Sequence, residues 1–356
     1  MFKIFVINPG STSTKVALYE DNEQVWVRTI RHKMEELAPF ARVVDQLEYR
    51  LDLIRKVMEE EGLEAHDLDA VMGRGGMIPN MQMGGYLVDE SLIKALSSDE
   101  IRAHAANLGG LLAYRIASQA DIPAYTYDAV TANDFPPVAK ITGIPDVVRA
   151  GYCHVLNTHA MGIKYAERLG RPYEELNLCI AHLGGGVSVS AHVHGKIVDS
   201  SSEDDGAFAP ERSGSVPLMQ VIDLCYSGKY SKDEMKDKVR GKGGLYALLG
   251  TKDIQEIEHR IEQGDEWADL VFHAQALQIA KGIGVITAAM KGNIDAIILT
   301  GGMAYSKMLT DMIIEHVRFM APVVLMPGEN EMEALAEGGV RILNGTEKAH
   351  RFEGMR

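Results

Sequence analysis

The 356-residue sequence is poor in cysteine and short of positive charge. Its three cysteines, Cys153, Cys179 and Cys225, are odd in number and lack the spacing of metal ligands, which favours a reducing cytosol. With 36 Lys and Arg against 50 Asp and Glu, the net charge is −14, which argues against a nucleic-acid or anionic-membrane surface. An anionic ligand would need local positive charge, so any anion-binding site in this chain must include particular Arg or Lys residues.

Long hydrophobic runs are also missing. No stretch approaches the roughly 18 consecutive apolar residues of a membrane-spanning helix. The N-terminus has no basic segment followed by an apolar core, because the first apolar strand soon meets Asn8-Pro9-Gly10. We therefore expect a soluble, cytoplasmic protein.

Two common phosphate-binding signatures are absent, namely the P-loop and the G-x-G-x-x-G fingerprint. In their place, residues 4–16 form an apolar strand, a turn of Gly10, Ser11 and Thr12, and a second strand that carries Lys15. Backbone N–H groups, hydroxyls and a lysine gathered at one spot suit a polyphosphate. Taken alone, the segment could equally be an ordinary polar turn.

A related hairpin returns at residues 177–193, where His182 and Leu183 precede three consecutive glycines. The later stretches 68–76 and 294–302 also resemble each other, since each is a strand that leads to Gly-Gly. Two pairs of similar segments in the same order indicate a duplication. The sequence therefore predicts an α/β protein of two similar domains, with residues 1–150 in the first and 151–331 in the second.

The coarse pattern of secondary structure supports this division. We expect strands at 3–8, 13–20, 25–31, 70–72 and 123–127, and again at 177–183, 187–193, 196–201 and 296–299. Helices are expected at 35–61, 99–119 (with Ser98 or Asp99 as N-cap), 216–227, 231–239, 253–263 and 266–290. A C-terminal helix over 332–356 is expected to join the first domain.

A few polar residues stand out beside these elements. Arg74 lies among glycines, which would leave its guanidinium free to bind an anion in a forked geometry. Asp128 ends a strand, where ligand-facing residues of α/β sheets tend to lie. Each candidate has a plainer alternative: Arg212 could be a surface residue, and His154 a hydrogen-bonded core histidine. The acidic segment at 328–333 could be only a helix start, since carboxylates favour helix N-termini.

Taken together, the motifs resemble the acetate/butyrate kinase family. In chain order they lie at residues 8–15, 73–76, 104–109, 127–128, 182–186, 210–214, 242–244 and 299–302. The resemblance implies an actin-like fold of two duplicated ribonuclease-H-like domains with a nucleotide cleft between them. It also implies reversible, in-line phosphoryl transfer from ATP to a short-chain carboxylate such as butyrate or a branched C4–C5 acid, in a homo-oligomer.

The resemblance assigns roles to residues that match the family motifs. Asn8 and Glu331 would help to hold Mg²⁺, and Arg74 would clamp the acid. Arg212 and His154 would stabilise the phosphoryl group, with Asp128 as acid/base or as organiser of Mg²⁺. The implied ATP-binding residues are Asn8, Gly10, Ser11, Thr12, Lys15, His182, Gly184, Gly185, Gly186, Gly301 and Gly302.

Two departures from the family pattern concern the acyl site. Acetate kinases carry a second histidine four residues after the His154 equivalent, where this chain has Thr158 followed by His159. Butyrate kinases usually have proline where this chain has Ala129. These departures concern the substrate range rather than the reaction, so an acetate or propionate kinase stays open as an alternative. A sugar or polyol kinase of the same fold is a separate alternative. A nucleotide switch is less consistent, because no spare domain is left for polymer or peptide contacts.

Overall fold

The computed structural model describes residues 1–201 and 204–354, and the chain forms two compact units. Unit 1 comprises Met1–Ala132 and Asn330–Arg356, and unit 2 comprises Asn133–Glu329. From the sequence we expected the domains to meet at residue 150 and the second to end at residue 331. Residues 133–150 group with unit 2 because the N–H of Asp134 donates to Ile197 O and the guanidinium of Arg149 pairs with Asp199.

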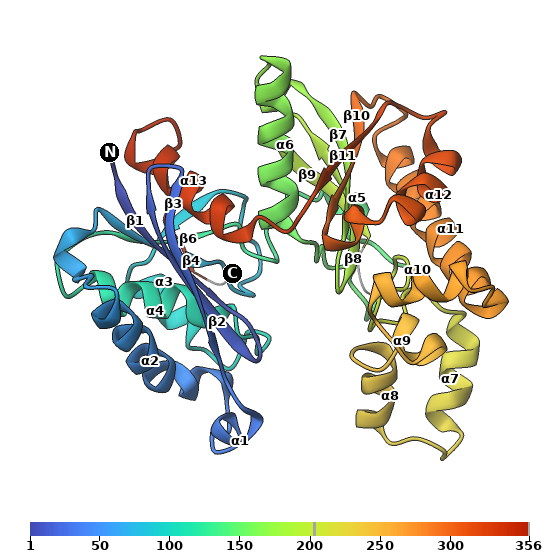
Figure 1. The fold of residues 1–356 in the computed structure, drawn as a ribbon, viewed down its shortest axis with the longest axis horizontal. Helices are drawn as coiled ribbons and strands as arrows, with labels where there is room; N and C mark the ends of the chain where they lie inside the picture. Colours follow the sequence, from blue (N-terminus) through green and yellow to red (C-terminus); the bar gives the residue numbers. More distant parts are fainter. Residues whose placement is uncertain (202–203, 355–356) are drawn as a thin grey trace. The chain divides into compact units, whose positions relative to one another are not determined.

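Unit 1 is built on a six-stranded sheet with the strand order β3-β2-β1-β4-β6-β5. Its first three strands pair antiparallel, and β4 and β6 continue the sheet parallel to β1 (Figure 1). The strands are β1 (Lys3–Pro9), β2 (Ser13–Glu20), β3 (Glu23–Arg31), β4 (Ala70–Arg74), β5 (Gly85–Leu87) and β6 (Ala124–Tyr127).

Unit 2 repeats this arrangement in a five-stranded sheet with the order β11-β10-β7-β8-β9. Here β7, β8 and β9 form the antiparallel part, and β10 and β11 run parallel to β7. Even the register irregularity recurs, between Leu18 and Tyr19 in unit 1 and between Ala191 and His192 in unit 2. The predicted duplication is therefore confirmed. The strands are β7 (Asn177–Leu183), β8 (Val187–Val193), β9 (Lys196–Ser201), β10 (Ala296–Gly301) and β11 (Val323–Pro327).

The helices of unit 1 differ from two sequence-based predictions. The expected helix over 35–61 is wrong: α1 stops at Leu37 and α2 starts at Leu47, because Pro39 cannot continue a helix. The expected C-terminal helix to 356 is also wrong, since α13 ends before Gly345, whose φ is +80°. The helices are α1 (Met34–Leu37), α2 (Leu47–Glu60), α3 (Glu90–Leu96), α4 (Asn107–Ala117) and α13 (Glu331–Leu343).

The helix expected over 99–119 begins late, at Asn107. Ser98 does not cap it, because its Oγ accepts the N–H of Glu100 in a separate turn. The Asn107 amide donates to Arg102 O at 3.0 Å and accepts the N–H of Met77 at 2.8 Å, which fixes the start of α4. Contacts distant in sequence thus set this boundary.

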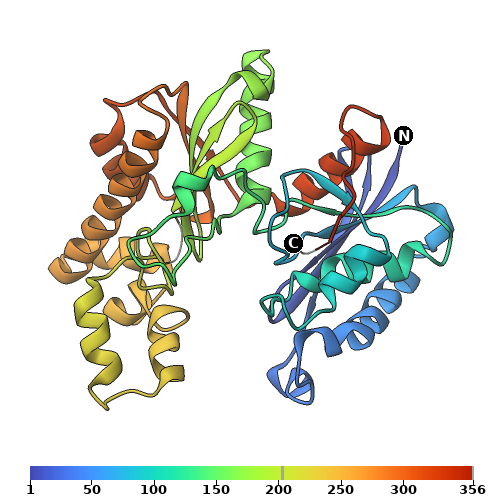
Figure 2. The same cartoon turned by 180° about the vertical axis from the view of Figure 1, so that it is seen from behind.

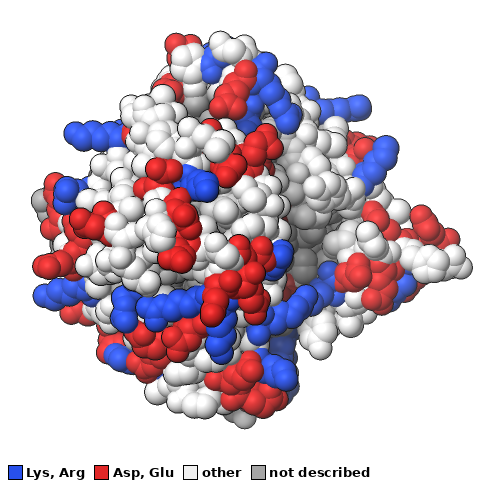
Figure 3. Space-filling view, turned by 60° about the vertical axis from the view of Figure 1, so that its left-hand side comes forward, with Lys and Arg blue, Asp and Glu red and all other residues white. Residues whose placement is uncertain are grey.

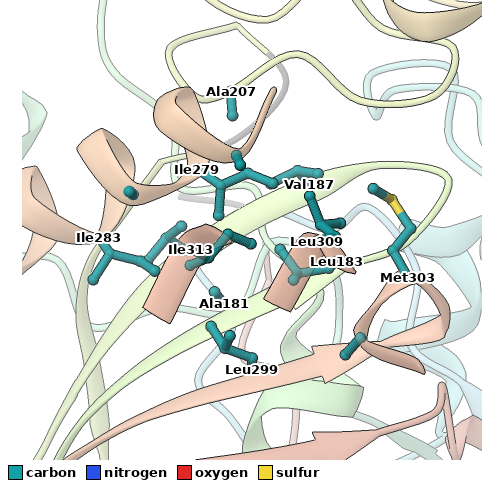
Figure 4. Packing of buried hydrophobic residues seen from close by; sticks show 14 of the residues in the cluster. Ala181, Leu183, Val187, Ala207, Ile279, Ile283, Leu299, Met303, Leu309 and Ile313 are labelled. Atoms are coloured by element: carbon teal, nitrogen blue, oxygen red, sulfur yellow. The ribbon is translucent and has the colours of Figure 1, made fainter. Parts of the chain in front are cut away.

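Helices cover both faces of the unit 2 sheet. Helix α6 lies on one face, and α11 and α12 lie on the other (Figures 1 and 2). Figure 4 shows the core beneath them, where Leu183 and Val187 of the first hairpin meet Ile279, Leu309 and Ile313. The helices are α5 (Pro137–Lys140), α6 (Val155–Leu169), α7 (Leu218–Tyr226), α8 (Lys232–Val239), α9 (Gly244–Leu249), α10 (Ile254–Glu262), α11 (Glu266–Ala289) and α12 (Lys307–Val317).

Helix α11 is the one helix in 1–201 and 204–354 that is long and apolar enough to cross a membrane, with a mean hydropathy of 1.2 over its best 18 residues. Its residues Val271, Phe272, Ile279 and Ile283 are buried in the unit 2 core. This is the position of a core helix. On the face shown in Figure 3, basic side chains are scattered among acidic ones rather than gathered in one patch.

Candidate functional site

The polar turn of unit 1 connects β1 to β2. Asn8 and Lys15 are direct cross-strand neighbours, so their side chains leave the same face of the sheet. The N–H of Gly10 donates to Ser13 O at 2.7 Å and closes the turn. Ser11 and Thr12, at its tip, are exposed. Hydroxyls and backbone N–H groups at this tip are therefore accessible to a ligand.

The structure brings together three predicted site residues that are far apart in sequence. Asn8 Nδ2 donates to Glu331 Oε2 at 2.7 Å. The Arg74 guanidinium lies 3.0 Å from Glu331 Oε1 through Nη2 and 3.2 Å from Oε2 through Nη1, a forked pairing with both carboxylate oxygens. Arg74 Nε is buried without a hydrogen-bond partner. Arg74 therefore binds the carboxylate of Glu331 and still has one N–H group, at Nε, without an acceptor.

The glycines beside Arg74 have a different role from the one expected. A Cβ on Gly73 would come 2.2 Å from Gly109 O, and one on Gly75 would come 2.6 Å from Ala129 Cα. These glycines allow β4 to pack against the α4 backbone and against the segment after β6. The guanidinium is not left free but is engaged with Glu331, so the motif at 73–76 is first of all a packing motif.

Asp128 follows β6 in an unusual backbone conformation. Its φ is +46°, and the side chain is 2% exposed. Asp128 Oδ1 accepts the N–H of Gly84 at 2.8 Å, while its own N–H donates to Gly84 O at 3.1 Å. A left-handed aspartate held at both ends is a strained, preorganised position of the kind that often serves a function.

The histidines of unit 2 form a stacked pair. His154, which precedes α6, lies over His182 of β7 with ring centroids 3.9 Å apart and an interplanar angle of 14°. His182 Nδ1 shares a hydrogen bond with Asn157 Oδ1 at 2.8 Å, and His154 Nδ1 shares one with Ser188 Oγ at 2.8 Å. Neighbouring side chains therefore orient both imidazoles, as a catalytic position requires.

The glycine loop after β7 adjoins Arg212. The N–H of Gly184 donates to Gly186 O at 3.0 Å, which folds the loop on itself. A Cβ on Gly186 would come 2.3 Å from Arg212 Nη1, so the guanidinium packs directly on this glycine. Arg212 therefore packs against the glycine loop after β7 and is not an isolated surface residue.

The loop that carries Arg212 is fixed by the motif at 242–244. The N–H groups of Gly243 and Leu245 donate to Glu211 O and Ala209 O. Gly244 has a φ of +59°, and a Cβ there would lie 1.7 Å from Ala209 O. This explains why the family motif includes two glycines away from any ligand-facing strand.

The second Gly-Gly pair ends β10. Gly301 has a φ of +89°, and a Cβ there would come 2.3 Å from Leu183 O. Its N–H and C=O exchange hydrogen bonds with Gly328 at 3.1 and 3.0 Å. Gly302, by contrast, has nothing within 4 Å of an added Cβ. The backbone at Gly302 is therefore open on the side that a ligand would approach.

The residues at which this chain departs from the family pattern, namely Thr158, His159 and Ala129, are buried. Thr158 is fully buried within α6, and the ring of His159 packs on Tyr173 with centroids 5.4 Å apart. Tyr173 shares a hydrogen bond of 2.6 Å with His192, whose pKa is lowered to about 3 by burial and by His159. His159 thus adjoins a buried polar cluster.

Sequence reasoning missed Arg50, which lies behind the polar turn of unit 1. Its guanidinium is 1% exposed and donates to Gly10 O at 2.8 Å. A signal was present, because Arg50 falls between Leu47 and Ile54 on the apolar face of the predicted helix. A charge on a core-facing stripe is rare unless it is paired or hydrogen-bonded.

Comparisons with known proteins identify the family of this chain. The acetokinase family pattern matches residues 148–346. A curated relative from Caldanaerobacter subterraneus subsp. tengcongensis, "Probable butyrate kinase 2", is 47% identical over 348 residues, 98% of each chain. An acetate kinase from Porphyromonas gingivalis superposes with a TM-score of 0.81 at 19% identity, covering 96% of this chain and 100% of its own. A propionate kinase from Francisella tularensis subsp. tularensis SCHU S4 gives 0.75 at 18% identity, covering 95% and 99%.

The structural likenesses, at these low identities, establish the shared two-domain fold. The family pattern covers more than half of the chain, and the curated relative aligns over 98% of it. Because both the fold and the sequence agree, this chain belongs to the acetokinase family, the kinases that phosphorylate a carboxylate with ATP.

Proposed function

We propose that this enzyme phosphorylates butyrate or a branched C4–C5 carboxylate with ATP, giving ADP and an acyl phosphate, and that the reaction runs in both directions. The main support for this proposal is the 47% identity, over 98% of the chain, to a relative named "Probable butyrate kinase 2".

The substrate needs little activation. A short carboxylic acid has a pKa close to that of glutamate, about 4.3, so about 99% or more of it is ionised at pH 7. The ionised carboxylate is already the nucleophile, and a strong general base is not required. The obstacle is the approach of one anion to another, which makes positioning and positive charge decisive.

Arg74 is the proposed clamp for this carboxylate. Its forked contact with Glu331, at 3.0 and 3.2 Å, is the geometry with which an arginine binds a substrate acid. Arg212 and His154 are proposed to stabilise the transferring phosphoryl group. Support comes from the packing of Arg212 on Gly186 and the orientation of His154 by Ser188.

Mg²⁺ is proposed as the accompanying ion. Asn8 and Glu331 offer an amide oxygen and a carboxylate, the hard oxygen donors that Mg²⁺ prefers, and two protein ligands suit an ion that otherwise binds phosphates and water. No cluster of three or more His, Cys, Asp or Glu residues that could hold a metal ion exists among the described residues. When bound, the ion would neutralise phosphate charge. Glu331 also accepts from Arg74, so its carboxylate serves both partners.

Asp128 is proposed to organise the metal and its waters rather than to remove a proton, because the nucleophile is already ionised. The hydrogen bond from the Gly84 N–H to Oδ1 fixes the orientation of the carboxyl group. If Asp128→Asn abolishes turnover and steeply raises the Mg²⁺ requirement, the metal role is supported. An unchanged Mg²⁺ dependence would contradict it.

The deciding experiment is acyl-phosphate formation from ATP and Mg²⁺, trapped as the hydroxamate, with acetate, propionate, butyrate, isobutyrate, valerate and isovalerate. Glycerol and hexose serve as controls for ADP release. We expect kcat/KM to peak at four or five carbons. A peak at acetate or propionate would overturn the chain-length proposal, and ADP release only with a polyol would overturn the reaction itself.

A homo-oligomer and a cytoplasmic location are further proposals that come from the family resemblance. Size-exclusion chromatography with light scattering tests the first, with a dimer or larger species as the expected result. Fractionation of the producing cells tests the second.

A further inference from the structure

The polar turn of unit 1 rests on a buried arginine from a different element. Arg50 Nη1 donates to Gly10 O at 2.8 Å and to Thr14 Oγ1 at 3.0 Å, and Nη2 donates to Ser11 O at 3.2 Å. Nε and Nη2 donate to Gln46 Oε1 at 3.1 and 2.8 Å. The guanidinium thus uses its donors on the turn and on its own helix.

These contacts decide which way the backbone of the turn faces. The peptide bonds here are trans, so the N–H of each residue points away from the C=O of the residue before it. Because the carbonyls of Gly10 and Ser11 are directed at Arg50, the N–H groups of Ser11 and Thr12 are directed away from it. Ser11 and Thr12 are exposed. Two donors are therefore held toward solvent from behind.

The charge of Arg50 is not neutralised locally. Its acceptors are carbonyls, a hydroxyl and an amide, and it forms no ion pair within the part of the chain that the structure describes. His32, which shares a 2.8 Å hydrogen bond with Thr14 Oγ1, has its pKa lowered to about 4 by burial and by Arg50, so it is neutral at pH 7. A fixed positive charge thus lies behind the turn in a chain of net charge −14.

We propose that Arg50 is a positioning residue for the nucleotide phosphates: it aims the Ser11 and Thr12 N–H groups at them, and its buried charge attracts them. The inference rests on the proposed function only in assuming that the turn binds phosphate. Arg50 itself lies behind the turn and touches no substrate, so its effect is on phosphate affinity and not on recognition of the base or the acid.

The first test is Arg50→Lys, which keeps the charge but loses the fork that reaches several acceptors at once. Binding of MgATP and of adenosine is measured by calorimetry or competition on the full chain. We expect the MgATP Kd and the KM for ATP to rise about tenfold. The adenosine Kd and the KM for the acid should stay within twofold. Arg55→Lys, an exposed arginine on the same helix, is the matched control and should change nothing.

The second test is Gln46→Glu, which keeps the two acceptor contacts to Arg50 but places a negative charge beside it. The fold is retained because the pair becomes an ion pair of the same shape. We expect a melting temperature no lower than that of the wild type, together with a MgATP Kd about fivefold higher and an unchanged adenosine Kd. If Arg50→Lys does not fold, the MgATP affinity of Gln46→Glu alone tests whether Arg50 contributes to phosphate binding.

The proposal is overturned if Gln46→Glu binds MgATP like the wild type, or if Arg50→Lys weakens ATP and adenosine equally. Failure of the proposed function looks different. In that case the wild type binds MgATP, and binds it more weakly in these variants, but phosphorylates no acid.

Discussion

The two units share a strand order but place their arginines differently around corresponding turns. In unit 1, Arg50 lies behind the β1–β2 turn, 1% exposed, and bonds to backbone carbonyls. In unit 2, Arg212 lies beside the β7–β8 turn and packs on Gly186. A duplicated scaffold therefore provides two kinds of positive charge. One is buried and bonded to backbone carbonyls, and the other is a side chain that packs on a glycine of the turn.

The comparison extends to the strands before the turns. Asn8 lies opposite Lys15 in unit 1, and His182 lies opposite Ser188 in unit 2, each pair one register step from the turn. The same sheet position thus carries a side-chain amide in unit 1 and an oriented imidazole in unit 2. Divergence after duplication changed the chemistry of the side chains but kept the hairpin.

The largest effect should come from Arg212→Ala. If Arg212 follows charge in the transition state, kcat falls by roughly 10³ or more while the KM for ATP changes modestly, as measured by steady-state kinetics. Gly186→Ala sharpens the test because its Cβ would displace the guanidinium, and we expect a loss of about 10- to 100-fold. A drop of less than about tenfold in Arg212→Ala would remove this arginine from the transition state.

The next largest effect on catalysis should come from Arg74→Lys. The lysine balances Glu331 but cannot form the fork, and two charge-assisted hydrogen bonds weakened together correspond to a rise of about 30- to 100-fold in the KM for the acid. The KM for ATP should change by less than about threefold. Arg115→Lys on α4, which replaces an exposed arginine, is the control. Equal changes in both KM values would argue against an acid clamp.

The Gly-Gly pair of unit 2 offers a matched test of stability. Gly301→Ala combines a φ of +89° with a Cβ 2.3 Å from Leu183 O, so the free energy of unfolding should fall by about 2–4 kcal/mol. Gly302→Ala meets nothing within 4 Å and should change stability by less than about 1 kcal/mol. Urea unfolding measures both. Similar values for the two variants would contradict the structural reading.

The smallest effects at neutral pH concern one buried histidine in each unit. The pKa of His32 is about 4 and that of His192 about 3, both below the usual 6.5, so the unfolded chain binds more protons in acid. The contribution of each neutral, buried histidine to the free energy of unfolding is fully present above about pH 6.5. It is lost as the pH falls toward the pKa of that histidine in the folded chain. Each should cost about 2 kcal/mol at pH 5 relative to pH 7. His32→Gln and His192→Gln should each flatten the pH dependence of urea unfolding, and an unchanged slope would contradict the burial argument.

Much of the fold could be predicted because the hairpins have local signals. The strands at 177–183 and 187–193 were expected from alternation and turn residues, and the structure confirms them. Helix α6 had no such signal: Asn157, Thr158 and His159 lie on its buried side, so polar residues mask the periodicity. The buried amide of Asn157 donates to Gly328 O and shares a hydrogen bond with His182 Nδ1, partners that only the folded chain brings near.

The site was predictable as a set of residues but not as an arrangement. The motifs around Asn8, Arg74 and Glu331 were identified, yet nothing local indicates that Arg74 and Glu331 pair. Similarly, the glycines of 73–76 were expected to leave the Arg74 guanidinium free to bind an anion and instead allow close backbone packing. Spatial roles of this kind depend on contacts between segments far apart in sequence.

One feature of the chain path bears on how the enzyme is made. Helix α13, which carries Glu331, packs against β1 and β4 but is encoded after the whole of unit 2. At about 5–20 residues per second, a ribosome needs roughly 10–40 s between completing residue 132 and reaching Glu331. During that interval the nascent first domain lacks a core helix and its carboxylate. A chain that ends before α13 lacks the helix that packs on β1 and β4, so we expect it to expose apolar sheet residues that chaperones could bind.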